Sequence, residues 1–284
     1  MVYEHDIPAG SRLYFGKSAY VKRTIERVAA ETLYAMGYEE IVTPIFSYHQ
    51  HEAFDDAKEL VRLNDEENHE VSLRADSTAD VIRIVTKRLG RSSEAKKWFY
   101  IQPVMTYPTR ENYQVGAEEI GGDFVEAAKR AAQLLEKLAL RPVMQLSNMR
   151  IPKLLHERYG VALDDLKAMH IEALCEMTEW MAALVAIDSV EDLKDLSVFP
   201  EDIAAELDML RLAASEIAYA PIVVAPLFYA KMRYYDALVF RCIEGNDTLA
   251  TGGAYRIGDT KAAGFALNVD ACIARKMKEG QADE

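Results

Sequence analysis

One stretch of the sequence, residues 99–122, most constrains the fold. Residues 99–104 are apolar and favour a β-strand, and residues 107–110, Tyr-Pro-Thr-Arg, have the composition of a turn. Residues 113–120 are again mostly small or apolar, and two glycines follow them. This order predicts two adjacent antiparallel strands joined by a short turn, in the middle of a sheet.

Two polar residues of the second strand are candidates for binding a ligand. Gln114 and Glu118 are four residues apart, so they project from the same side of a strand. Either this side is solvated, or both residues are buried and have polar partners, because an unpaired buried polar group is costly. The second interpretation predicts a site for a small polar ligand.

Composition and charge exclude several classes of protein. The chain has 284 residues, of which 50% are hydrophobic and 28% are charged, as in an ordinary globular protein. It has no apolar run of ~18 residues, as a membrane span requires, and no N-terminal secretory signal, so we expect a cytoplasmic protein without a membrane partner. Its three cysteines have no metal-ligand spacing, so we expect buried free thiols and no metal site.

The net charge of −13 argues against a nucleic-acid partner, because a protein that grips phosphates does so with many Lys and Arg side chains. Five basic residues gather within residues 87–97. A solvated loop explains this group at least as well as a binding surface.

Hydrophobic periodicity predicts the remaining elements. Helices are expected at residues 17–36, 78–89 and 123–139 and through most of 150–217, with breaks at Gly160, near Asp188 and at Pro200. Strands are expected at residues 38–46, 59–63, 70–75, 143–146, 222–227, 232–240 and 263–268. The pattern predicts an α/β (α+β) fold, formed by one domain over residues 1–284. It has a mixed, mainly antiparallel sheet of about six strands flanked by helices, and a helical insertion at about 140–220.

The central stretch also carries a family resemblance. Residues 114–121, Gln-Val-Gly-Ala-Glu-Glu-Ile-Gly, are similar to motif 2 of the class II aminoacyl-tRNA synthetases in its histidyl form, Q-x-G-x-E-x-I-G. The resemblance implies a class II fold in which Gln114 and Glu118 contact histidine. Residues 17–46, a helix, a glycine and a strand, resemble motif 1, which implies a homodimer built on this segment.

Three further segments extend the resemblance. Residues 73–79, Leu-Arg-Ala-Asp-Ser-Thr-Ala, resemble L-R-P-E-x-T-A, which implies that Asp76 meets the α-amino group of histidine; a plain helix N-cap is the equal alternative. Residues 232–240 resemble a histidine-specific signature with paired tyrosines, here Tyr234 and Tyr235, although a strand with aromatic faces is the alternative. Residues 251–256 resemble a G-G-R-Y-D turn, which adds Tyr255 to the implied histidine-binding residues.

The departures from the family pattern concern ATP. Three arginines that synthetases use on ATP and the acyl phosphate fall on Thr106, Ala230 and Ala271. Losing one such group typically lowers a rate by about 10²–10³. The residues therefore imply a protein without synthetase catalysis and without a cofactor.

The histidyl-synthetase-like family has one branch of this form, which also lacks the anticodon-binding domain: the regulatory subunits of ATP phosphoribosyltransferase, in histidine biosynthesis. Membership would imply a short-form ATP phosphoribosyltransferase catalytic subunit as partner, a role in its activation and histidine feedback inhibition, and free histidine as ligand. Two alternatives stay open. One is an ATP-dependent amino-acid ligase, and the other is a stand-alone histidine-binding module or dimerisation scaffold.

Overall fold

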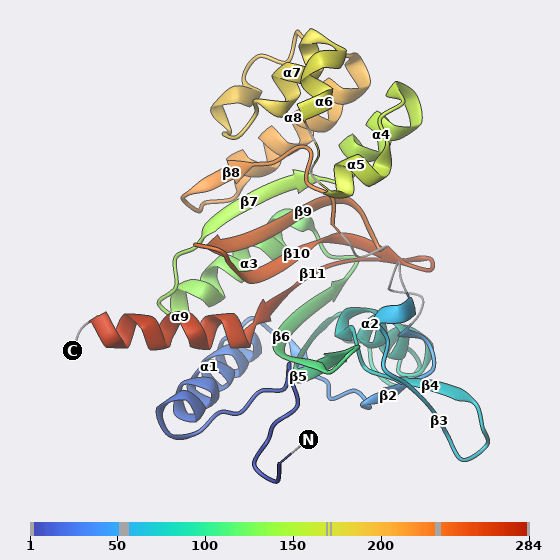
Figure 1. The fold of residues 1–284 in the computed structure, drawn as a ribbon, viewed down its shortest axis with the longest axis vertical. Coiled ribbons are helices and arrows are strands. Elements are labelled where there is room, and N and C mark those ends of the chain that lie inside the picture. Colours follow the sequence, from blue (N-terminus) through green and yellow to red (C-terminus); the bar gives the residue numbers. More distant parts are fainter. Residues whose placement is uncertain (1–2, 51–56, 169, 171, 231–233, 283–284) are drawn as a thin grey trace. The chain divides into compact units, whose positions relative to one another are not determined.

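The computed structural model describes the chain except for residues 1–2, 51–56, 169, 171, 231–233 and 283–284 (Figure 1). The chain forms two compact units. The first contains Met1–Ile120, Lys137–Leu140 and Ala266–Glu284, and the second contains Gly121–Glu136 and Arg141–Phe265. Among the described residues, the larger sheet has eight strands and the smaller sheet has three.

The central strand pair of the first unit confirms the prediction for residues 99–122. Strand β5, Lys97–Thr106, pairs antiparallel with β6, Arg110–Ile120. The register runs without interruption from Lys97 opposite Glu119 to Thr106 opposite Arg110, and three residues form the turn. A third strand, β1 at Glu39–Glu40, pairs parallel with β5.

The expected single strand at residues 38–46 is wrong. Its two ends form β1, in the larger sheet, and β2, Phe46–Ser47, in the smaller one. The chain between them is not a strand. The carbonyls of Thr43 and Pro44 instead accept hydrogen bonds from the Arg74 guanidinium, at 2.8 and 3.1 Å, and Pro44 has no N–H to donate.

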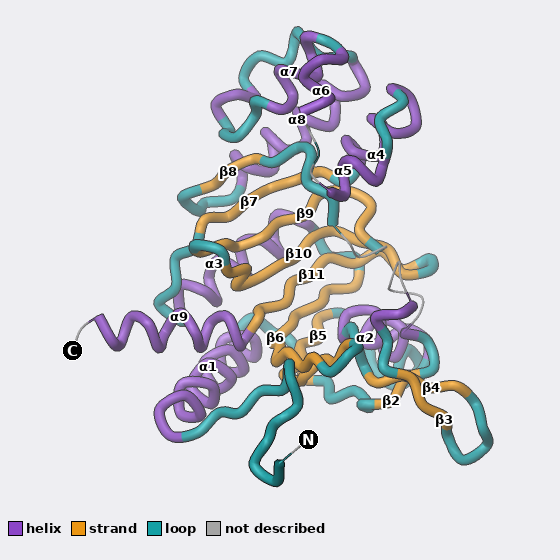
Figure 2. Tube along the Cα trace, in the orientation of Figure 1, coloured by secondary structure: helices purple, strands orange, loops and turns teal. Residues whose placement is uncertain are grey.

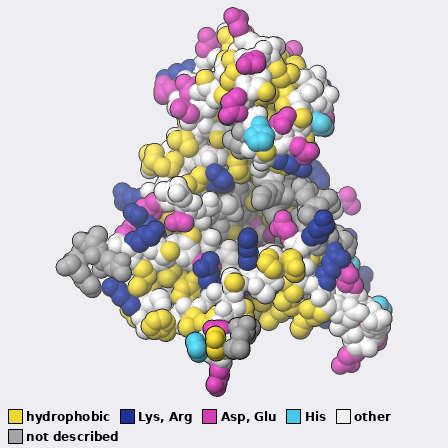
Figure 3. Space-filling view, viewed as in Figure 1, with side chains coloured by type: hydrophobic (Ala, Val, Ile, Leu, Met, Phe, Trp, Pro, Cys, Tyr) yellow, Lys and Arg dark blue, Asp and Glu magenta, His cyan; other side chains and the backbone are white. Residues whose placement is uncertain are grey.

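The smaller sheet contains two strands close to those expected at residues 59–63 and 70–75. Its order is β2, then β4 at Glu70–Leu73, then β3 at Arg62–Asn64, and both pairings are antiparallel. A short 3₁₀ helix, η2 at Ala57–Glu59, precedes β3. Acidic side chains and a histidine lie at the tip of the hairpin, at the lower right of Figure 3.

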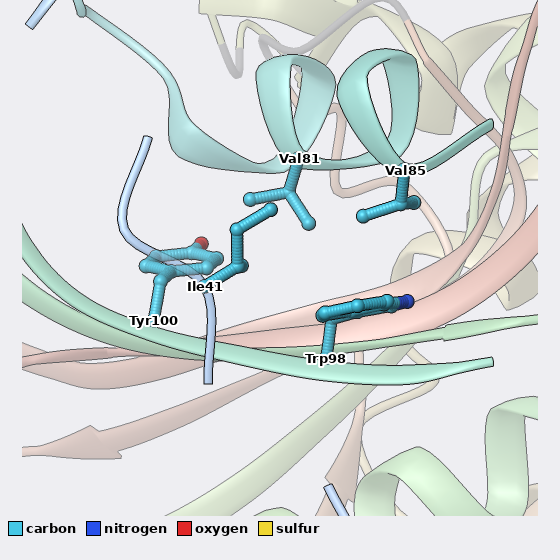
Figure 4. Packing of buried hydrophobic residues seen from close by; sticks show 5 residues of the cluster. All are labelled: Ile41, Val81, Val85, Trp98 and Tyr100. Carbon is cyan, nitrogen blue, oxygen red and sulfur yellow. The ribbon is translucent and has the colours of Figure 1, made fainter. Parts of the chain in front are cut away.

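Three α-helices complete the described part of the first unit. They are α1 at Gly16–Ala35, α2 at Ser77–Lys87 and α9 at Val269–Ala282, and α1 packs against α9. Helix α2 covers one face of β5. Figure 4 shows Val81 and Val85 of this helix directed toward Trp98, Tyr100 and Ile41 in a buried cluster. The predicted helices at 17–36 and 78–89 are therefore confirmed within one or two residues.

The second unit begins with α3, Phe124–Lys137, and contains four strands of the larger sheet in the order β10-β9-β7-β8. They are β7 at Val143–Asn148, β8 at Ile222–Val224, β9 at Tyr235–Glu244 and β10 at Asp247–Ile257. The pairings of β9 are antiparallel, and β7 with β8 is parallel. The apolar face of α3 packs on this part of the sheet through Phe124, whose ring centroid is 6.0 Å from that of Phe240. Strand β11, Thr260–Asn268, returns the chain to the first unit.

The helical segment between β7 and β8 also agrees with the sequence pattern (Figure 2). It consists of α4 at Arg150–Tyr159, α5 at Leu163–Ala168, α6 at Glu172–Met177, α7 at Glu179–Val185, η3 at Glu191–Leu193 and α8 at Glu201–Glu216. Gly160 ends α4 with a φ of 73°, a conformation that glycine adopts without strain. The breaks near Asp188 and at Pro200 are confirmed as well.

The fold class is therefore the expected α/β fold with a mixed, mainly antiparallel sheet, although the sheet is larger than the six strands expected. Residues 251–256 lie inside β10 and not at a turn. Cys242 and Cys272 are buried, but Cys175 is exposed, so the expectation of three buried thiols is wrong for that residue. Among the described residues, no helix is long and apolar enough to cross a membrane.

Candidate functional site

Glu118 is in the interior of the first unit and not on a solvated face. It is 1% exposed and lies on β6, directly opposite Trp98 of β5. The hydroxyl of Thr78, at the start of α2, donates to Glu118 Oε1 at 2.7 Å, and the hydroxyl of Tyr100 donates to the same oxygen at 3.4 Å. The expected polar partners of a buried carboxylate are thus supplied by α2 and by the neighbouring strand.

The strand pair is shaped to bring these groups together. Gly116 lies opposite Tyr100, and a Cβ at this position would be 2.1 Å from the tyrosine ring. Only glycine therefore lets the Tyr100 ring lie across β6 and reach Glu118. Gln114 projects from the same side of β6 and is half-buried, opposite the buried Gln102.

Asp76 is the N-cap residue of α2. Its carboxylate accepts a hydrogen bond from the backbone N–H of Ala79 at 2.8 Å, and its backbone is extended. The capping interpretation is therefore correct for one carboxylate oxygen. Thr78, which donates to the Glu118 carboxylate, is two residues after Asp76, so the start of α2 carries both Asp76 and a partner of Glu118.

The three implied tyrosines gather in the second unit. The ring centroids of Tyr234 and Tyr235 are 4.9 Å apart, and those of Tyr234 and Tyr255 are 5.3 Å apart. Tyr255 is buried and lies opposite Tyr235 across β9 and β10. The structure thus forms two groups from the six implied residues: Asp76, Gln114 and Glu118 in one unit, and the tyrosines in the other.

Small side chains occupy the three positions that the resemblance aligns with synthetase arginines. Thr106 ends β5. The N–H of Ala230 is 3.2 Å from the sulfur of Met149, and the N–H of Ala271 donates to Asn268 Oδ1 at 3.1 Å. Lys231, Met232 and Arg233 lie outside the described residues.

A buried polar layer supports the first group, and sequence reasoning did not identify it. It contains Thr43, Ser47, Gln50, Ser72, Arg74, Ser77, Asp80 and Gln102, all at most 5% exposed. Gln102 Nε2 donates to Thr43 Oγ1 and to Ser77 Oγ, each at 3.0 Å. Ser47 Oγ donates to Asp80 Oδ1 at 2.9 Å. The layer therefore joins the segment after β1 to the start of α2. Its only sequence signal is the number of polar residues inside otherwise apolar stretches.

Comparison with known proteins is consistent with this geometry. A family model described as histidyl-tRNA synthetase matches residues 15–272. Among solved structures, a protein described as an ATP phosphoribosyltransferase regulatory subunit/histidyl-tRNA synthetase from Bacillus halodurans has the same fold. The TM-score is 0.82 at 19% identity, covering 96% of this chain and 83% of that one. The chain belongs to the histidyl-tRNA synthetase family.

Two relatives define its place more narrowly. The chain is 44% identical to the ATP phosphoribosyltransferase regulatory subunit of Wolinella succinogenes, over 99% of both chains. It is 41% identical to the protein of the same name from Helicobacter hepaticus, over 96% of this chain and 98% of that one. Within the histidyl-tRNA synthetase family, it is one of the ATP phosphoribosyltransferase regulatory subunits.

Proposed function

We propose that this chain is non-catalytic, binds a short-form ATP phosphoribosyltransferase catalytic subunit, raises its rate and contributes to its inhibition by histidine. The observation that carries the proposal is the 44% identity over 99% of both chains with a regulatory subunit of that enzyme. The residues that the family resemblance implies for histidine binding support it: Asp76 and Glu118 are present in the first unit, and the tyrosine group is present in the second. A protein of this kind acts by binding one state of its partner more tightly than another.

The replacement of three arginines supports the non-catalytic part. ATP carries negative charge that a synthetase must neutralise, and Thr106, Ala230 and Ala271 supply none. An ATP-dependent ligase would need cations at these places, which disfavours that alternative. The stand-alone histidine-binding module is disfavoured by the identity to named subunits of a larger enzyme.

Mixing experiments test the proposal directly. We expect the rate of phosphoribosyl transfer by a short-form catalytic subunit to rise on addition of this chain, and histidine to lower the rate of the mixture. We expect no histidine-dependent ATP–pyrophosphate exchange by the chain alone. Equal transferase rates with and without the chain would contradict the regulatory function, whereas measurable exchange would favour the ligase.

We also propose a homodimer built on residues 17–46. Several large apolar side chains of this segment are exposed, including Tyr20 and Tyr34 on α1 and Val42, Ile45 and Phe46 near β1 and β2. Exposed apolar side chains that gather in one segment are typical of an interface between subunits.

The acidic net charge of the chain supports a protein partner and not a nucleic acid. A role in biosynthesis supports a location in the cytoplasm.

The dimer prediction can be checked by sedimentation. We expect the wild-type chain to be a dimer at micromolar concentration and V42D to dissociate toward the monomer, because burial of a new carboxylate is costly. V198D is a matched control, since Val198 is exposed in the helical segment before α8. A monomeric wild type without partner, or equal dissociation of both variants, would contradict the proposed interface.

A further inference from the structure

One glutamine near the candidate histidine-binding residues uses its whole side-chain amide in buried hydrogen bonds. Gln50 is 1% exposed. Its Oε1 accepts from the backbone N–H groups of Ala75 and Asp76, at 2.8 and 2.6 Å. Its Nε2 donates to the backbone carbonyl of Asp76 at 2.9 Å and to Asp80 Oδ2 at 2.7 Å. A side-chain amide has two donor hydrogens and two acceptor lone pairs, so Gln50 is fully satisfied.

These bonds hold Asp76 in a defined position. Gln50 binds both the N–H and the carbonyl of Asp76, and the carboxylate of Asp76 binds the N–H of Ala79. The N–H of an N-cap residue takes no part in the helix ladder, so the helix alone does not set the backbone orientation of that residue. In this chain Gln50, which is 26 residues earlier in the sequence, restrains the backbone of Asp76 through these hydrogen bonds.

The glutamine is itself held by the buried polar layer. Asp80, which accepts from Gln50 through Oδ2, accepts through Oδ1 from Ser47 at 2.9 Å and from Arg83 at 2.8 Å. Ser47 and Gln50 belong to one short segment, so two of its side chains reach the same carboxylate. Both oxygens of the Asp80 carboxylate are thus paired, and a buried carboxylate held in this way favours one geometry, because an unpaired buried group would be costly.

We propose that Gln50 is a positioning residue for the histidine pocket. By fixing Asp76 relative to the first turn of α2, Gln50 sets the orientation of the group that meets the histidine α-amino nitrogen. The affinity of the pocket for histidine therefore depends on Gln50, although Gln50 does not contact the ligand. This inference rests on the proposed function, since it requires histidine to bind at Asp76.

Substitution of Gln50 by methionine tests the inference. Methionine fills a similar volume but forms none of the four hydrogen bonds. We expect Q50M to raise the histidine concentration that half-inhibits the mixture with the catalytic subunit on the order of tenfold. The dissociation constant of histidine for the chain alone, measured by calorimetry, should rise equally. Activation without histidine should stay within about twofold of wild type.

The matched control is S47A. It removes a hydrogen bond to the other oxygen of the same Asp80 carboxylate and leaves every bond between Gln50 and Asp76 in place. We expect S47A to lower thermal stability while histidine inhibition stays within about twofold of wild type. This comparison separates positioning from a general loss of stability.

The possible results distinguish a failure of the Gln50 role from a failure of the proposed function. A histidine response of Q50M equal to wild type, or equal losses in Q50M and S47A, would overturn the role of Gln50 while leaving the proposed function intact. No histidine binding by wild type would overturn the proposed pocket and, with it, this role. Should Q50M not fold, Q50N takes its place. Its shorter side chain keeps the amide but cannot reach all four partners, so the same expectation and the same contradicting results apply.

Discussion

R74M is expected to lower the free energy of unfolding by at least about 3 kcal/mol, because three backbone carbonyls in buried or part-buried hydrogen bonds lose their guanidinium donor. Arg74 is 2% exposed. Its guanidinium donates to the carbonyl of Thr43 at 2.8 Å, to that of Pro44 at 3.1 Å, and twice to that of Pro103, at 2.7 and 3.0 Å. Chemical denaturation of the isolated chain measures the effect.

Two variants sharpen this measurement. Lysine in place of Arg74 keeps the charge but has a single compact head that cannot reach three carbonyls, so R74K should lie between R74M and wild type. R91M is the control, since Arg91 is exposed in the loop after α2, and its loss should change stability by no more than about 0.5 kcal/mol. Equal stability of R74M and R91M would contradict a structural role for Arg74.

The buried position of Arg74 has an electrostatic cost that the fold compensates. Burial lowers the pKa of the guanidinium, and the negative charge of Asp80 opposes this shift. Asp80 is itself buried and accepts hydrogen bonds from Ser47, Gln50 and Arg83. The positive charge of Arg74 and the negative charge of Asp80 therefore stabilise each other within the buried polar layer. A buried charge without such a partner would be costly.

E118A is expected to weaken histidine inhibition of the complex by about 10- to 100-fold, while activation of the catalytic subunit is retained. This 10- to 100-fold weakening corresponds to the loss of one charge-assisted hydrogen bond between histidine and a buried carboxylate. Glu118 is 1% exposed, so its carboxylate acts in a place where water screens little. Histidine titrations of transferase rate, with and without this chain, measure the effect.

The neighbouring carboxylate provides the control. Glu119 projects from the opposite side of β6 and lies 4.0 Å from Lys97 Nζ. E119A should leave histidine inhibition within about twofold of wild type. Because histidine and the catalytic subunit each bias one equilibrium, the coupling between them is reciprocal, so E118A should weaken the effect of histidine on assembly as well. Unchanged inhibition in E118A would show that histidine acts at another site.

Local patterns in the sequence determined the central strand pair and most helices. Alternation along residues 99–120 sets which side chains share a face, and a proline with polar neighbours ends the first strand, so the pairing of β5 with β6 needs no distant information. The same alternation placed Gln114 and Glu118 on one side. Helix α1 was predictable because its apolar positions recur every three or four residues.

Tertiary structure alone decided what happens at residues 38–50 and which residues support the candidate site. Pro44 is a local sign of the break within residues 38–46, but the group that holds the chain there, the Arg74 guanidinium, is 31 residues from the Thr43 carbonyl that it binds. Thr43 and Gln102 are 59 residues apart, and Gln50 and Asp80 are 30 apart. Hydrogen bonds between residues this distant leave no periodicity in the sequence, so Gln50 and Arg74 become visible as supporting residues only when the chain is folded.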